Sequence, residues 1–396
     1  MSSIDLRKLF FSLMGQTSDS PSAIEIERAE GIYMYAPDGK RYVDLIAGIS
    51  VSNVGHCHPK VIKAITEQIN RHMHLTVYGE YIQSPQVAYA KKLTDLLPEK
   101  LSSVYYVNSG SEATEGAMKL AKRYTGRTET VAFEKAYHGS THGALSLMGD
   151  EYRRNAFRPL LPGIKRLVFN NEEQLEQISE QTACVMVEPV QGEAGAIVAS
   201  RNFLKKLRKK CDETGALLIF DEVQTGFGRL GQWFAFMKYD VVPDIMTIAK
   251  SMGGGMPIGA FVSSPNIMRT LQFDPVLGHI TTFGGHPASC AAASAALEVI
   301  AEERLIESVA DKANLFRKEL QSADIEEIRG DGLLMAAETG SPERLQAFVK
   351  KSYEAGVATD WFIFCDTAFR IAPPLTITDE QIIEVCRILR KTLSEV

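Results

Sequence analysis

The chain has 396 residues, of which 45% are hydrophobic and 23% charged, and its formal net charge is -6. A chain of this length exceeds what one hydrophobic core usually supports, so we expect two domains. It has no run of five or more basic residues and no long apolar segment, so neither nucleic-acid binding nor a membrane span is expected.

The number and spacing of the cysteines indicate the cellular compartment of the protein. The six cysteines are scattered without a Cys-x-x-Cys pair, and four of them lie beside or within apolar segments. This usage predicts reduced core cysteines in a cytoplasmic protein. The first residues have neither the apolar core nor the cleavage site of a secretion signal, which agrees with a cytoplasmic location.

The first part of the chain predicts an arm and a hairpin. The arm contains a short helical stretch, 6–14, followed by a polar segment. Two β-rich runs, 31–35 and 41–45, flank the turn residues 37–40 and predict a hairpin. A helix is expected over 59–73 because its apolar residues have helical spacing.

Two His-x-His pairs in this part could suggest a metal site. They are His56 with His58 and His72 with His74. No cysteine or carboxylate cluster accompanies either pair, so we expect no metal.

From residue 104 to 264, short apolar runs alternate with helical stretches. The runs lack polar alternation, as expected of strands that are buried on both faces of a sheet. They are 104–107, 130–133, 167–169, 184–187, 216–220, 245–248 and 260–262. Helical stretches lie between them, such as 111–124, 172–180 and 200–214. The alternation predicts an α/β domain with a mostly parallel sheet.

Chemically useful residues follow five of these runs. Ligands of open α/β sheets bind beyond the carboxyl ends of the strands. The turn 108–111 contains a glycine and opens a helix, which predicts a phosphate site. The other runs are followed by 137–139, by the carboxylates of 188–193 and 221–222, and by Lys250. Each could be only a cap, a loop, a solvated strand end or a surface lysine, but their convergence on one edge favours an active site.

Lys250 is the residue around which the site is expected to form. It follows an apolar run and precedes three glycines, 253–255. Burial lowers the pKa of a lysine and makes it an amine nucleophile, as a Schiff base requires. This lysine, a phosphate-binding helix start, the aromatic Tyr137 and the carboxylate Asp221 together suit pyridoxal 5'-phosphate.

The remainder of the chain predicts a smaller α+β domain. Helices are expected over 287–301, 305–321, 342–355 and 379–393, with β-rich segments at 325–329 and 333–337. We therefore divide the chain into an N-terminal arm and hairpin that belong to the small domain (1–50), a large cofactor-binding domain (51–285) and a C-terminal small domain (286–396).

Eight motifs occur in order between Gly31 and Pro374. They are Gly-His-x-His-Pro (55–59), Asn-Ser-Gly-Ser-Glu-Ala (108–113), Tyr-His-Gly (137–139), Glu-Pro-Val-Gln-Gly-Glu (188–193), Asp-Glu-Val-Gln-Thr-Gly-Phe-Gly-Arg (221–229), Ala-Lys-Ser-x-Gly-Gly-Gly (249–255), Thr-Thr-Phe-Gly-Gly (281–285) and Arg-Ile-Ala-Pro-Pro (370–374). The set resembles class III, subgroup II, of the fold-type-I pyridoxal-phosphate aminotransferases, which includes acetylornithine, ornithine and 4-aminobutyrate aminotransferases. The resemblance implies a large domain with a mostly parallel seven-stranded sheet flanked by helices, and a smaller α+β domain.

The resemblance also implies cofactor contacts. Lys250 corresponds to the Schiff-base lysine and Asp221 to the residue that binds the pyridinium nitrogen. Gln224 would hydrogen-bond the ring hydroxyl, and Val223 and Tyr137 would pack on the two ring faces.

Further roles concern the phosphate and the substrate. Gly110 and Ser111 would hold the phosphate, and Thr282 would reach the phosphate of a neighbouring subunit, which implies a homodimer with shared sites. Arg370 would bind a substrate α-carboxylate. Glu193 can pair with that arginine in this family, which lets one site accept both an ω-amine and 2-oxoglutarate.

Three positions depart from the family pattern. Ser140 stands where these relatives usually have an arginine that contacts a substrate carboxylate, and Arg153 or Arg154 could compensate. Ile49 stands where ornithine aminotransferase has a tyrosine that resembles a substrate contact. His286 replaces the more common asparagine, and we assign it no function.

These observations predict a pyridoxal-phosphate-dependent aminotransferase that passes an amino group from an ω-amino donor to 2-oxoglutarate, giving glutamate. The expected donors are acetylornithine or ornithine first, then another diamino acid, a diamine or 4-aminobutyrate. The alternatives are a racemase or aminomutase on the same fold, or a non-catalytic binding protein. A nucleotide-binding oxidoreductase lacks its Gly-x-Gly-x-x-Gly turn here.

Overall fold

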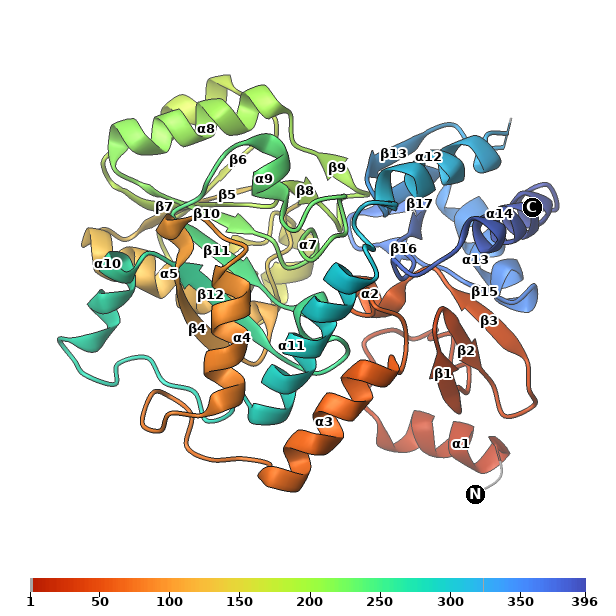
Figure 1. The fold of residues 1–396 in the computed structure, drawn as a ribbon. Coiled ribbons are helices and arrows are strands. Elements are labelled where there is room, and N and C mark those ends of the chain that lie inside the picture. The colour runs from red at the N-terminus through yellow and green to blue at the C-terminus, as the bar shows by residue number, and fades with distance from the viewer. Residues whose placement is uncertain (1–2, 323) are drawn as a thin grey trace.

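A seven-stranded sheet organises the larger part of the molecule (Figure 1). The computed structural model describes residues 3–322 and 324–396. Across the sheet the strands follow the order β4 (Ser103–Val107), β12 (Gly259–Ser263), β11 (Ile245–Ile248), β10 (Leu217–Asp221), β7 (Thr182–Val187), β5 (Glu129–Phe133) and β6 (Ile164–Leu167). β12 runs antiparallel to both of its neighbours, and the other pairs are parallel. The mostly parallel sheet is therefore confirmed.

The central strands are mostly apolar because helices cover both faces of the sheet. Every residue of β7 and β10 is buried. Helix α5 (Gly110–Thr125) shares one core cluster with Ile219, and helix α8 (Arg201–Thr214) shares the other with Leu218 and Phe220. Neighbouring residues of a strand point to opposite faces, so a strand between two helical layers needs an apolar residue at each position.

The predicted elements form with small differences at their ends. The run 167–169 contributes only its first residue to a strand, because β6 spans Ile164–Leu167. The helix expected over 172–180 is a short 3₁₀ segment, Glu173–Gln177.

The predicted hairpin is confirmed and belongs to a small sheet. Helix α1 (Ser3–Leu13) precedes β1 (Arg28–Glu30), β2 (Tyr33–Tyr35) and β3 (Arg41–Asp44), which pair antiparallel in that order. β15 (Val357–Ala358) then pairs parallel with β3. The two ends of the chain therefore share one sheet.

The C-terminal part has a second small sheet with helices beside it. Its strands follow the order β13 (Ile328–Asp331), β14 (Leu334–Glu338), β17 (Cys365–Ile371) and β16 (Trp361–Phe362), and the helices are α12 (Val309–Leu320), α13 (Pro342–Glu354) and α14 (Asp379–Leu393). A capping box of Thr378 and Gln381 starts α14.

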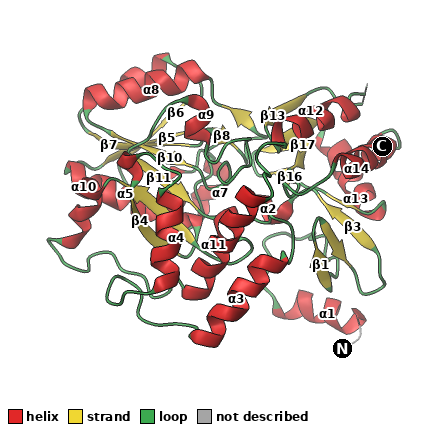
Figure 2. Ribbon diagram, in the orientation of Figure 1, coloured by secondary structure: helices red, strands yellow, loops and turns green. Residues whose placement is uncertain are grey.

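Three helices cross beside the large sheet (Figure 2). Helix α11 (Pro287–Glu302) packs against α3 (Pro59–Arg71) and α4 (Ser84–Thr94). The division into residues 1–50, 51–285 and 286–396 stays a prediction.

Short elements complete the fold. They are α2 (Ala47–Ser50), η1 (Glu99–Leu101), α6 (His142–Leu147), α7 (Glu151–Arg154), η2 (Asn155–Phe157), β8 (Val190–Gln191), β9 (Ile197–Val198), α9 (Ala235–Tyr239), η4 (Lys250–Gly253), α10 (Pro265–Met268) and η5 (Arg269–Gln272). Among the described residues, no helix has both the length and the apolar character needed to span a membrane.

Candidate active site

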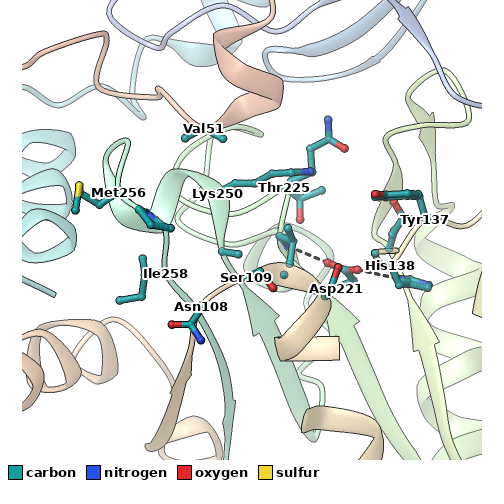
Figure 3. A pocket seen from close by; sticks show the side chains of 18 of the residues that line it. Val51, Asn108, Ser109, Tyr137, His138, Asp221, Thr225, Lys250, Met256 and Ile258 are labelled. Carbon is teal, nitrogen blue, oxygen red and sulfur yellow. Dashed lines mark hydrogen bonds and ion pairs between the residues drawn. The ribbon is translucent and has the colours of Figure 1, made fainter. Parts of the chain in front are cut away.

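A cavity of about 380 Å³ lies at the carboxyl edge of the large sheet (Figure 3). The segments after β4, β5, β7, β10 and β11 all contribute to it, as the sequence predicted. We call it the inner cavity, and its lining comprises Val51, Asn108, Ser109, Gly110, Ser111, Tyr137, His138, Gly139, Glu188, Val190, Asp221, Val223, Gln224, Thr225, Ala249, Lys250, Gly255, Met256, Pro257 and Ile258.

One end of the inner cavity is the N-terminus of helix α5. Ser109 caps this helix, because its side chain accepts a hydrogen bond from the backbone N–H of Glu112 at 3.2 Å. The first backbone N–H groups of a helix have no partner within the helix and attract anions. Gly139 lies against this turn, with a φ of +125°, and a Cβ there would collide with Ser111. Gly110 and Ser111 therefore sit where a phosphate can approach.

Asp221 ends β10 at the base of the inner cavity, and each of its oxygens has a partner. Oδ2 pairs with Nδ1 of His138 at 2.6 Å, and Oδ1 accepts from the backbone N–H of Val223 at 3.0 Å (Figure 3). Burial alone would lower the pKa of His138, but the hydrogen bond to Asp221 and the charges of Asp221 and Glu188 raise it. A carboxylate with a partner at each oxygen is fixed in position.

Glu188 lies beside this pair. Its carboxyl group accepts hydrogen bonds from the backbone N–H groups of Tyr137, at 3.1 Å, and Gly192, at 3.4 Å. Burial raises the pKa of Glu188, although the charge of His138 opposes the shift. This carboxyl group therefore ties the loop of the aromatic residue to the loop after β7.

Lys250 projects into the inner cavity (Figure 3). It follows β11 and has a φ of +49°, which is an uncommon backbone conformation for a residue with a side chain. Burial lowers its pKa, and the charges of Glu193 and Asp221 oppose the shift. A lysine with a lowered pKa offers a neutral amine at a lower pH than a solvated one does.

The residues expected around the cofactor ring also reach this cavity. Val223, Gln224 and Tyr137 are all part of its lining. Gln224 is 7% exposed, and among the described residues its Nε2 has no hydrogen-bond partner. A Cβ at position 192 would collide with the Gln224 side chain, so Gly192 leaves room for that amide.

A second cavity, of about 500 Å³, adjoins the first, since Tyr137 and Lys250 line both. We call it the outer cavity. Its lining is mostly apolar and aromatic and comprises Ser22, Ile46, Ile49, Tyr137, Glu193, Lys250, Val349, Tyr353, Thr359, Asp360, Trp361, Phe362, Ile363 and Arg370. A ligand can therefore approach Lys250 from the outer cavity.

Arg370 and Glu193 form a buried ion pair in the wall of the outer cavity. Nη1 and Nη2 of Arg370 each donate to one oxygen of Glu193 at 3.1 Å. Their side chains are 1% and 6% exposed. Burial alone would raise the pKa of Glu193, but the charge and hydrogen bonds of Arg370 outweigh it and lower the pKa.

The three departures from the family pattern are located as follows. Ser140 is exposed, and its backbone N–H donates to Ser111 Oγ at 3.2 Å. Arg153 pairs with Asp150, the N-cap of α7, and Arg154 pairs with Glu151 in that helix. Neither arginine lines the inner or the outer cavity. Neither arginine therefore takes the place of the arginine that these relatives usually have where this chain has Ser140.

Ile49 lines the outer cavity, whereas Thr282 lies outside both cavities and is exposed. The neighbouring Thr281 accepts a hydrogen bond from the Asn108 side chain at 3.1 Å, which ties this loop to the start of α5. His286 stacks on His74 with their ring centroids 5.7 Å apart.

Both histidines of the first His-x-His pair contact a carboxylate. His56 pairs with Asp44 at 2.8 Å, and His58 pairs with Glu303 at 3.0 Å. Within residues 3–322 and 324–396, no group of three or more His, Cys, Asp and Glu side chains is placed to hold a metal ion.

The inner cavity offers the groups that pyridoxal 5'-phosphate needs. A helix start at one end suits the phosphate, the fixed carboxylate of Asp221 suits the ring nitrogen, and the unpartnered amide of Gln224 suits an oxygen on the ring. Lys250 supplies the amine. The residues present therefore fit this cofactor.

The comparisons with known proteins agree with the site. The family model described as aminotransferase class-III matches residues 14–393. The acetylornithine aminotransferase of Methanopyrus kandleri is 40% identical over 356 residues, 89% of this chain and 90% of that protein. A [LysW]-aminoadipate semialdehyde/glutamate semialdehyde transaminase of Sulfurisphaera tokodaii is 35% identical over 94% of this chain and 95% of that protein.

A solved structure matches the whole fold. The ornithine aminotransferase of Toxoplasma gondii has a TM-score of 0.92 and 29% sequence identity, over 100% of this chain and 95% of that chain. That structure has partial occupancy of pyridoxal phosphate at its active site.

The fold and the site thus define a pyridoxal-phosphate-dependent aminotransferase. The chain belongs to the class III aminotransferase family.

Three residues of the site received no role from the sequence. His138 and Glu188 stand inside quoted motifs, so the motifs could have directed attention to them. Asp360, which contacts Arg370, stands in no motif. Only the pairing of β16 with β17 brings it to the site.

Proposed function

We propose that the enzyme transfers an amino group from an ω-amino donor to 2-oxoglutarate, giving glutamate. The observation that carries this proposal is the buried pair of Arg370 and Glu193 in the outer cavity, beside Lys250. With Glu193 in place the arginine is masked and a donor can enter with its amine first. With Glu193 moved aside, the two Nη atoms can bind the carboxylate of a 2-oxo acid.

Each residue of the inner cavity then has a task. When bound, pyridoxal phosphate supplies a protonated ring that withdraws electrons from the substrate carbon. Asp221 would hold the proton on the ring nitrogen, and Gln224 would orient the ring through its hydroxyl. Tyr137 and Val223, which line the cavity, would pack against the ring.

Lys250 acts on the substrate. Its neutral Nζ would take a proton from the substrate carbon and deliver it to the reactive carbon of the cofactor, first as a general base and then as a general acid at close range. Gly110 and Ser111 anchor the phosphate, so the reacting carbons stay within reach of Nζ.

We infer that the first donors to test are acetylornithine and ornithine, as the named relatives indicate. Ser140 cannot supply a fixed positive charge, and the outer cavity is mostly apolar. Another diamino acid, a diamine and 4-aminobutyrate therefore belong in the same panel. The experiment incubates the holoenzyme with each donor and 2-oxoglutarate and measures glutamate. Absence of glutamate with every donor would refute the proposal.

We also propose a homodimer with shared sites. Exposed apolar side chains gather on segments 62–87 and 273–283. The two segments are in contact through His74 and Phe283, whose ring centroids lie 4.9 Å apart. Apolar surface of this extent favours burial in an interface. Thr282 lies in this surface, which supports its role at the phosphate of the neighbouring subunit. Sedimentation would test the proposal, and an active monomer would contradict it.

A cytoplasmic location is also proposed. Six unpaired cysteines, four of them buried, support it.

A further inference from the structure

Arg370 has a second carboxylate partner besides Glu193. Its two Nη atoms donate to Glu193, whereas its Nε donates to Oδ1 of Asp360 at 2.8 Å. The two carboxylates therefore occupy different edges of the guanidinium group. If the Nη edge is to exchange Glu193 for a substrate, another contact must keep the guanidinium in place.

Asp360 and Arg370 belong to neighbouring strands of one sheet. Asp360 directly precedes β16, the antiparallel partner of β17, which contains Arg370. The backbone N–H of Arg370 donates to the carbonyl of Asp360 at 2.8 Å. The Thr359 hydroxyl donates to the Arg370 carbonyl at 2.7 Å. These contacts hold the backbone of Asp360 beside that of Arg370 in the small sheet.

Glu193 reaches Arg370 from a different part of the fold. It lies between β8 and β9, beyond the carboxyl end of β7. Besides its pairing with Arg370, it accepts hydrogen bonds from the hairpin between β16 and β17: from the backbone N–H of Ile363 to Oε2 at 3.2 Å, and from that of Phe364 to its backbone carbonyl at 2.9 Å. A rotation of the Glu193 side chain would therefore break its contacts with Arg370 and leave those of Asp360 unchanged.

The remaining contacts of the guanidinium are consistent with a fixed Nε edge. Its Nη2 also donates to the carbonyl of Trp361 at 3.3 Å. Its central carbon lies 4.5 Å from the ring centroid of Phe362, which supports one face of the group. The Asp360 side chain is 29% exposed and lines the outer cavity, whereas Arg370 is 1% exposed.

We infer that Asp360 is a positioning residue for the acceptor half of the reaction. It holds the Nε edge of Arg370, so that Nη1 and Nη2 stay aimed at the outer cavity after Glu193 has moved aside. This inference rests on the proposed function. Loss of the Asp360 acceptor should weaken binding of a substrate carboxylate and change the chemistry at Lys250 little.

The test uses the acceptor half of the reaction, so that no donor is needed. The enzyme is loaded with pyridoxamine 5'-phosphate and mixed with increasing 2-oxoglutarate, while the change in absorption is followed. Asp360→Leu keeps the side-chain shape without a hydrogen-bond acceptor, and Asp360→Asn keeps an acceptor. The control is Asp366→Ala, which removes an exposed carboxylate from the same hairpin.

We expect Asp360→Leu to raise the half-saturating concentration of 2-oxoglutarate about tenfold, the effect of one lost charge-assisted hydrogen bond. The limiting rate should change less than about threefold, and Asp360→Asn and Asp366→Ala should resemble the parent enzyme. The affinity for glutarate, an unreactive dicarboxylate measured by calorimetry, should fall with Asp360→Leu by the same factor.

Other outcomes would overturn the inference. One is a half-saturating concentration of 2-oxoglutarate that Asp360→Leu leaves unchanged. The other is an equal rise of that concentration in Asp360→Leu and Asp360→Asn. If Asp360→Leu does not fold, Asp360→Ala replaces it, and failure of both to fold would assign Asp360 to stability alone. A parent enzyme that does not react with 2-oxoglutarate would refute the proposed acceptor, whereas a reactive parent with an insensitive Asp360 would refute only the inference.

Discussion

His138 Nδ1 lies 2.6 Å from Asp221 Oδ2, and both side chains are almost fully buried. The residues are 83 positions apart in the sequence, yet the order of β5, β7 and β10 in the sheet brings their strand ends together. The imidazole and the backbone N–H of Val223 hold the two oxygens of Asp221 in fixed directions. The protein's own groups therefore organise the base of the inner cavity.

Replacing Asp221 with alanine tests this arrangement. Turnover should fall about 10² fold or more, because the ring nitrogen loses the carboxylate that keeps it protonated. The cofactor should still bind, since the start of α5 and Lys250 remain, and its visible absorption reports this. Asp212→Ala, on the exposed side of α8, is the control. Nearly normal turnover by Asp221→Ala would refute the role of Asp221.

Arg370→Ala should raise the apparent KM for 2-oxoglutarate about 10² fold, because two charge-assisted hydrogen bonds to the carboxylate are lost. Steady-state kinetics with varied 2-oxoglutarate measure this. Arg370→Lys should recover little, since an ammonium cannot reproduce the planar fork. An unchanged KM would remove Arg370 from the carboxylate site.

The sequence predicted much of this site for a simple physical reason. Apolar runs define the strands, and the residues directly after them must meet at one edge, which located Lys250, Asp221 and the start of α5. Pairings between distant segments are not encoded locally. The partner of Arg370 at Nε and the partner of Asp221 at Oδ2 became visible only with the strand order. The antiparallel direction of β12 depends on packing in the same way.

Glu222 shows where a local interpretation was insufficient, and it leads to a prediction about pH. As a strand-end residue it could have been solvated, but it is 0% exposed. Burial raises its pKa from 4.5 to about 7, although hydrogen bonds from the Thr225 hydroxyl and the backbone of Phe236 oppose the shift. The folded protein therefore keeps a proton that the unfolded chain releases, and stability should fall as the pH rises from 4.5 to about 7.

Glu222→Gln should remove this pH dependence. Between pH 4.5 and about 7, the free energy of unfolding of the variant should rise relative to that of the parent, by roughly 3 kcal/mol at most. Above this pH range the difference should be constant. Urea unfolding of the holoenzyme at several pH values measures the difference. Glu213→Gln, on the exposed side of α8, should show no such trend. A Glu222→Gln difference that does not vary with pH would contradict the assignment.

Arg229 joins three distant segments from a fully buried position. It is 0% exposed, and its Nη1 donates to the carbonyls of Leu333 at 2.9 Å and Pro373 at 2.6 Å. Its Nη2 donates to the side-chain oxygen of Asn53. Burial lowers the pKa of Arg229 to about 9, so the charge is costly to bury and the donated hydrogen bonds must offset that cost.

Arg229→Met keeps most of the side-chain volume and removes these donors. Two buried carbonyls would then lack a partner, and the free energy of unfolding should fall by about 3 kcal/mol. Denaturant unfolding measures this loss, and Arg304→Met, at an exposed position, should leave stability within about 0.5 kcal/mol. Pro373 follows Arg370 by three residues, so the variant should also raise the KM for 2-oxoglutarate. If stability is unchanged, methionine packing must offset the lost hydrogen bonds, and Arg229 would not be needed to hold these segments together.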